Sequence, residues 1–125
     1  MESLSPNLFV KDITETIEFY RALGFSLAMT VPETGDLVWA MMTCGSVSFM
    51  FQTFASLGNT LPDVSRAGGG SLLLYIKLKN IRAFFDSVKN KVTVIQGLEK
   101  TFYGATEFSM KDNNGFLLTF AEGEQ

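Results

Sequence analysis

The apolar and polar positions of this chain run twice through the same order of predicted elements. In the first half, polar and apolar residues alternate over 7–11, which predicts a short strand. An apolar stripe at the spacing of one helix face follows, at Ile13, Ile17 and Tyr20. Three strand-like runs separated by turn residues complete this half, over 25–31, 37–43 and 47–54.

The ends of the first predicted helix are marked by residues that cap helices. Asp12 or Thr14 can cap its start, because their side-chain oxygens can accept hydrogen bonds from backbone N–H groups of the first turn. Gly24 is expected to end it. Residues 55–70 then show no clear period and include three consecutive glycines, which predicts a linker.

The same order begins again after this linker. A strand is predicted over 71–78, and Asn80 is expected to cap a second helix. The apolar stripe of that helix repeats the first stripe at a constant offset of 68 residues, as Ile81, Phe85 and Val88. Strands are predicted over 92–98, 105–111 and 116–122, and a hairpin turn over 112–115.

Two βαβββ modules are therefore predicted, and the fold class is α+β. The length of 125 residues fits a single domain, 1–125, with module one at 1–54, the linker at 55–70 and module two at 71–125. Each module is expected to form a short curved mixed sheet with its helix packed on the convex side. The concave sides would form a cavity.

Period-two alternation assigns residues to the two sides of each sheet. One set is apolar and is expected to lie under the helices: Phe49, Phe51, Phe108, Met110, Phe116, Leu118 and Phe120. The other set mixes polar and apolar residues and is expected on the concave side: Ser48, Met50, Gln52, Glu107, Ser109, Leu117 and Thr119. A mixed face of this kind suits a ligand cavity better than a dry core.

Composition narrows the classes of partner. With 10 basic and 13 acidic residues, the chain has a net charge of −3 and no basic cluster, so nucleic acid is not an expected partner. The apolar run 72–76 is too short to cross a membrane, and the charged N-terminal segment lacks the apolar core of a secretory signal. A single cysteine, Cys44, fits the reducing cytoplasm, and a small buried apolar residue is the expected role of Cys44.

The order and spacing of these elements resemble the vicinal oxygen chelate superfamily, which includes glyoxalase I, extradiol dioxygenases and bleomycin-resistance proteins. The segments that carry the resemblance are LFVKDITETIEFYRALGF, VWAMMTCGSVSFMFQT and FYGATEFSMKDNNGFLLTFAE. In the metal-dependent members, four strand positions hold His, Glu or Gln ligands. The resemblance places those positions at Ser5, Met50, Leu73 and Thr119. These residues are poor ligands for a catalytic divalent metal, so no metal and no cofactor are expected.

Candidate chemistry is limited, because the chain contains no histidine. This excludes Ser-His-Asp and Cys-His arrangements and leaves no side chain with an ordinary pKa near neutrality. Glu107 is the one acid predicted on the concave side. Glu107 could orient a cationic or hydrogen-bonding ligand, act as a general base, or be a structural carboxylate paired with a lysine, an arginine or a backbone amide.

The predicted function is metal-independent binding of a small molecule, a drug or a metabolite, in the concave cavity, as in the bleomycin-resistance branch of the superfamily. The ligand is expected to be cationic or aromatic, because aromatic side chains accompany Glu107. The predicted binding residues are Phe9, Trp39, Met50, Gln52, Tyr75, Tyr103, Glu107, Ser109 and Thr119. No residue is assigned a catalytic role, and a homodimer is expected because the sheet edges and concave faces are incompletely covered. The alternative is a lyase, isomerase or dioxygenase that uses Glu107 or an unrecognised metal site.

Overall fold

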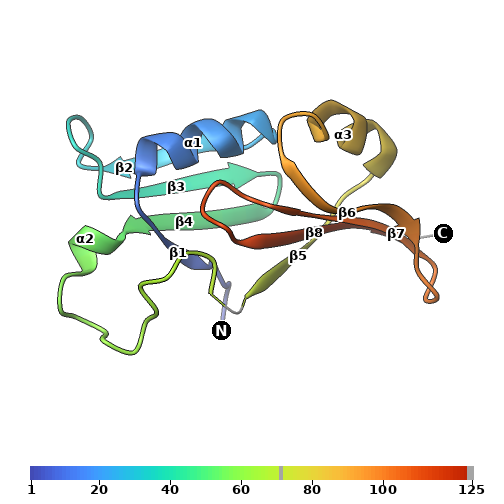
Figure 1. Cartoon of the computed structure of the whole chain (residues 1–125). Coiled ribbons are helices and arrows are strands. Elements are labelled where there is room, and N and C mark those ends of the chain that lie inside the picture. Colours follow the sequence, from blue (N-terminus) through green and yellow to red (C-terminus); the bar gives the residue numbers. More distant parts are fainter. Residues whose placement is uncertain (71, 124–125) are drawn as a thin grey trace. The chain divides into compact units, whose positions relative to one another are not determined.

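The computed structural model describes residues 1–70 and 72–123, and the chain divides into two compact units, Met1–Gly68 and Gly69–Gln125 (Figure 1). The first unit contains six elements: β1 (Asn7–Val10), α1 (Ile13–Ala22), β2 (Ser26–Val31), β3 (Trp39–Cys44), β4 (Val47–Thr53) and α2 (Phe54–Leu57). Its strands form one mixed sheet in the order β1-β4-β3-β2. Strand β1 runs parallel to β4, and the other pairs are antiparallel.

Helix α1 packs against β2, β3 and β4, and an aromatic cluster fills the space between them. Tyr20 is fully buried, and its ring lies 5.6 Å from Phe49 and 4.9 Å from Phe51. Of the two residues predicted to cap the start of α1, Asp12 and Thr14, the structure has Asp12, and Gly24 ends the helix as predicted. The Asp12 side chain accepts a hydrogen bond from the Glu15 backbone N–H at 2.9 Å, and Gly24 ends the helix at a φ of +101°, which few other residues adopt.

The second unit contains five elements: β5 (Leu73–Lys77), α3 (Ile81–Val88), β6 (Thr93–Lys100), β7 (Ala105–Lys111) and β8 (Leu117–Gly123). The sheet order is β5-β8-β7-β6, the counterpart of the first sheet. Helix α3 packs on β7 and β8. Phe85, a residue of the predicted apolar stripe, has its ring centroid 4.9 Å from that of Phe108. Phe84 lies outside the predicted stripe, and its ring centroid is 4.8 Å from that of Phe120. The βαβββ repeat is thus confirmed.

The assignment of residues to sheet faces is also confirmed. All seven residues of the predicted apolar set are buried. The residues between them in β4, β7 and β8 point to the face opposite the helix, and most of these are half-buried. We call these surfaces the face opposite α1 and the face opposite α3.

Three local expectations differ from the structure. Asn80 stands at the start of α3, but its side chain makes no capping hydrogen bond, because the Glu122 carboxylate accepts from the backbone N–H groups of Asn80 and Ile81 instead. The linker is not wholly irregular, since α2 occupies its start. Cys44 is exposed rather than buried, because it is the last residue of β3 beside the Gly45 turn.

Some strand ends, including both ends of β7, agree with the predicted bounds, and the others differ by one or two residues, because hydrogen-bonded pairing rather than alternation decides where a strand stops. The predicted start of the fifth strand, residue 71, lies outside the described residues. Within residues 1–70 and 72–123, no helix is long and apolar enough to cross a lipid bilayer, and the longest, α1, has 10 residues.

Candidate functional site

The Glu107 carboxylate on β7 is held by two tyrosine hydroxyls on the face opposite α3. The Tyr103 hydroxyl donates a hydrogen bond to Glu107 Oε2 at 2.6 Å, and the Tyr75 hydroxyl donates to the same oxygen. Glu107 therefore pairs with neither a lysine, an arginine nor a backbone amide in the described part of the chain. The three residues come from β5, β7 and the turn between β6 and β7.

The sheet order brings these side chains together. Tyr75 lies opposite Thr119 on β8, and Thr119 lies opposite Ser109 on β7. Glu107 is two residues from Ser109 and so shares its face. The Ser109 and Thr119 hydroxyls are hydrogen bonded at 2.8 Å, so they form a second polar pair beside the carboxylate.

Tyr103 reaches Glu107 from a tight turn. The Gly104 N–H donates to the Thr101 carbonyl at 3.2 Å, and the Ala105 N–H donates to Thr101 Oγ1 at 3.0 Å. Gly104 has a φ of +84°, a conformation that glycine adopts without strain. The turn thus fixes the direction in which Tyr103 leaves the sheet.

The carboxylate keeps both phenols protonated. Hydrogen bonding to Glu107, followed by desolvation and the carboxylate charge, raises the pKa of Tyr75 and of Tyr103 above the ordinary tyrosine value. Both therefore act as donors at neutral pH. Glu107 Oε2 receives both bonds, whereas Oε1 has no hydrogen-bond partner among residues 1–70 and 72–123. The cluster therefore offers one free carboxylate oxygen beside two exposed aromatic rings, 47% and 58% exposed.

The face opposite α1 carries a different polar pair, in the first unit. Asn7 Nδ2 donates to Gln52 Oε1 at 3.0 Å. Gln52 lies opposite Phe9 on one side and Trp39 on the other. Met50 lies opposite Asn7 and Met41 on the same face.

Within each unit, the structure brings the predicted binding residues together. In the second unit these are Tyr75, Tyr103, Glu107, Ser109 and Thr119. In the first unit they are Phe9, Trp39, Met50 and Gln52. Asn7 was missed as a site residue, although the alternation of the first strand places it on the same side as Phe9. The sequence signal that could have found Asn7 was its polar side chain on the same predicted side of the strand as Phe9.

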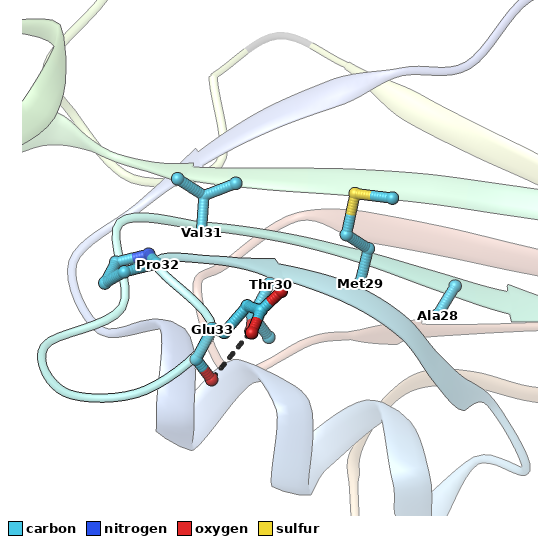
Figure 2. Close-up of a pocket in the computed structure, with 6 residues that line it drawn as sticks. All are labelled: Ala28, Met29, Thr30, Val31, Pro32 and Glu33. Carbon is cyan, nitrogen blue, oxygen red and sulfur yellow. Dashed lines mark hydrogen bonds between the residues drawn. The ribbon is translucent and has the colours of Figure 1, made fainter.

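Three cavities lie elsewhere on the two units. The first, of about 540 Å³, runs along the edge strand β2 and is lined by Ala28, Met29, Thr30, Val31, Pro32 and Glu33. Figure 2 shows Met29 and Val31 on one side of β2 and Thr30 on the other, where Thr30 Oγ1 donates to the Glu33 carbonyl at 3.4 Å.

The second cavity, of about 170 Å³, lies by the start of α1 and includes Asp12 and Asp36. The third, of about 440 Å³, lies by the start of α3 and includes Arg82 and Glu122. None of the three is lined by a predicted binding residue. The predicted binding residues therefore lie outside these three cavities.

The donor positions that the family resemblance implies do not fit a catalytic divalent metal. Ser5 offers a hydroxyl, Met50 a thioether, Leu73 an aliphatic chain, and Thr119 a hydroxyl that is bonded to Ser109. Such groups lack the charge or strong lone pairs of imidazole and carboxylate ligands. Over residues 1–70 and 72–123, no three or more His, Cys, Asp or Glu side chains are grouped as a metal ion would require.

Solved structures share this fold over nearly their whole length. The crystal structure of TioX from Micromonospora sp. ML1 is 20% identical, with a TM-score of 0.80, over 99% of this chain and 100% of that chain. A bleomycin-binding protein complexed with bleomycin is 21% identical, with a TM-score of 0.69, over 99% and 100%. A bleomycin resistance determinant encoded on the transposon Tn5 is 21% identical, with a TM-score of 0.71, over all of both chains.

These likenesses confirm the predicted glyoxalase-like fold of two similar modules. No curated protein matches the sequence. The sequence profile of the Glyoxalase/Bleomycin resistance protein/Dioxygenase superfamily matches residues 4–120. This chain therefore belongs to the glyoxalase/bleomycin resistance protein/dioxygenase superfamily.

Proposed function

We propose that this chain is a metal-independent binding protein that sequesters a small molecule, a drug or a metabolite, without changing it. The observation that carries the proposal is the Glu107 carboxylate, fixed by Tyr75 and Tyr103 with one oxygen left free. The bleomycin-binding protein and the bleomycin resistance determinant, which have the same fold, support a binding role. The unsuitable donor positions support metal independence.

The ligand class follows from the chemistry around Glu107. A carboxylate oxygen accepts hydrogen bonds and attracts positive charge, and tyrosine rings interact favourably with flat or cationic groups. The two phenols are donors that hold Oε2, so Oε1 is the atom that a ligand N–H would reach. We infer a ligand with a flat cationic group, such as an amidinium or a guanidinium.

The remaining groups on the two faces favour binding over catalysis. The chain has no histidine to move protons near neutral pH. The raised pKa of Tyr75 and Tyr103 keeps both phenols protonated near neutral pH, so neither is present as a tyrosinate that could accept a proton, and each gives up its proton less readily than an ordinary tyrosine. Ser109 and Thr119 bond to each other, and among residues 1–70 and 72–123 neither hydroxyl bonds to the Glu107 carboxylate, the base that could activate it as a nucleophile.

The homodimer and the cytoplasmic location are part of the same proposal. Among the strands of residues 1–70 and 72–123, β2 pairs with β3 alone, so within this part of the chain its outer edge is free for another strand. Met29 and Val31, which are exposed, lie on this strand and would be covered by a second copy. The exposed thiol of Cys44 fits a reducing compartment, where a free cysteine persists.

The test uses a cation and a neutral molecule of the same shape. Benzamidinium and benzamide are titrated into the protein, and binding is followed by ¹⁵N-labelled amide spectra. We expect benzamidinium to bind more tightly and to move the Glu107 and Tyr103 backbone signals. In Glu107→Gln, which keeps the shape but removes the charge, benzamidinium affinity should fall about tenfold or more.

The matched control is Glu33→Gln, which makes the same change of charge at an exposed site of the other unit. It should leave both affinities unchanged. Equal binding of the cation and the neutral molecule, or equal loss in the two variants, would show that Glu107 is not the recognition site. A large fall in the melting temperature of Glu107→Gln with unchanged binding would make Glu107 a structural residue.

A further inference from the structure

The Gln52 side chain on β4 is held in one orientation by a neighbouring strand. Asn7 on β1 donates its amide N–H to Gln52 Oε1 at 3.0 Å. Asn7 Oδ1 is itself buried and has no partner in the described part of the chain. The hydrogen bond between Asn7 and Gln52 is therefore the polar contact that fixes the orientation of both side-chain amides, since a buried amide without any partner costs folding free energy.

This bond determines which end of the Gln52 amide is available. Gln52 is half-buried, and with Oε1 occupied by Asn7 its free end is the Nε2 amino group, which makes no hydrogen bond within residues 1–70 and 72–123. An amide nitrogen of this kind is a donor. The face opposite α1 therefore presents a donor, whereas Glu107 in the other unit presents an acceptor.

Two aromatic residues flank this donor. Phe9 on β1 and Trp39 on β3 both lie opposite Gln52 in the strand register. Residues opposite one another in neighbouring strands are close enough for their side chains to touch. The Phe9 ring is supported by Phe54, with ring centroids 6.4 Å apart. A donor between two aromatic rings suits a flat ligand group that carries an acceptor.

We infer that Gln52 is a donor subsite for the carbonyl, or an equivalent acceptor, of a flat aromatic group, and that Asn7 is the residue that positions it. This deepens the proposed function, on which it rests, because it names a chemical group that a ligand of the first unit would carry. Neither subsite depends on the other for its geometry, as each lies within one unit.

Two small probes test this subsite: acetophenone, a flat aromatic ketone, and ethylbenzene, a similar molecule without an acceptor. The readouts are the Gln52 side-chain NH₂ signals and the indole N–H signal of Trp39, the one tryptophan of the chain. The Gln52 pair is identified by its absence in Gln52→Glu. We expect acetophenone to move both readouts and to bind about three- to tenfold more tightly than ethylbenzene, the usual effect of one neutral hydrogen bond.

Two variants separate the role of Gln52 as a donor from the role of Asn7 in positioning it. Gln52→Glu keeps the shape and can keep the bond from Asn7, but its outward atom becomes an acceptor, so the preference for acetophenone should disappear. Asn7→Leu releases Gln52 and should reduce the same preference severalfold, while the affinity for ethylbenzene stays unchanged. Asn59→Asp, an exposed change of the same charge as Gln52→Glu, is the control.

The outcomes distinguish failure of this inference from failure of the proposed function. If ethylbenzene and acetophenone move the Trp39 signal equally and leave Gln52 still, the face binds apolar groups and the donor subsite is overturned. If neither probe moves Trp39, and benzamidinium shows no preference at Glu107, both proposals fail. A variant that loses its dispersed backbone spectrum is replaced by Gln52→Met, which removes the donor without adding charge.

Discussion

Glu122, near the end of β8, takes the place of a capping side chain at Ile81, the first residue of α3. Its carboxylate accepts from the Ile81 N–H at 3.1 Å and from the Asn80 N–H at 3.0 Å. These bonds lower the pKa of Glu122, and the bond from Ile81 is the larger cause. One carboxylate thus joins the last strand of the second unit to its helix.

Glu122 should therefore make the stability of the protein depend on pH. Because its pKa is lower in the folded state, its contribution is present above the ordinary glutamate pKa and is lost as pH falls through the folded value. We expect Glu122→Gln to melt at a lower temperature than the parent at pH 7. The difference should shrink as pH falls below 4. The control, Glu18→Gln on α1, removes an exposed charge paired with Arg21 and should show a much smaller difference.

The two tyrosines bonded to Glu107 should titrate at unusually high pH. Because the pKa of each tyrosine is raised in the folded state, the contact between phenol and carboxylate contributes its full stabilisation below the ordinary tyrosine pKa. That stabilisation is lost as the pH rises through the pKa values of the folded state. We expect Glu107→Gln to move both titrations back toward the ordinary range. Tyrosinate absorbance near 295 nm, compared between parent and variant, measures the change. Identical titration curves would contradict the hydrogen-bonded cluster.

The sequence predicted the parts of the fold that local pattern controls. The stripes at Ile13 and Ile81 repeat at one offset, and alternation placed Phe51 and Phe108 under their helices. These features depend on residues close in sequence, so one chain is enough to find them. The cap from Asp12 was predicted for the same reason, since its partner is Glu15.

Features that depend on residues far apart in the sequence could not be predicted from the local pattern of apolar and polar positions. The cap of α3 comes from Glu122, 41 residues beyond Ile81, and the left-handed conformation of Asn80 turns its side chain away from that role. The same limit applied to the contacts around Glu107. Alternation placed Glu107 on the correct face, but its contacts with Tyr75 and Tyr103 require the order β5-β8-β7 and a specific turn.

The purified protein should carry no stoichiometric transition metal. The reason is the donor set at Ser5, Met50, Leu73 and Thr119, which offers no imidazole or carboxylate. We expect elemental analysis of protein purified without chelator to find well below one equivalent of zinc, nickel, iron or manganese. Added zinc or nickel should raise neither the melting temperature nor glyoxalase activity. One tightly held equivalent per chain would contradict metal independence.

A single lysine on β2 should weaken the proposed homodimer. Met29 is 58% exposed on an edge strand that pairs with β3 alone, and edge strands with exposed apolar side chains readily pair with another chain. We expect the parent to sediment as a dimer at micromolar concentration. Met29→Lys should shift it toward the monomer, because the new charge would be buried in the contact. Leu61→Lys, on an exposed loop residue of similar exposure, 61%, should leave the dimer intact.

A parent that stays monomeric throughout this range would show that the free edge of β2 has no such partner, and an equal effect of both lysines would place the contact elsewhere.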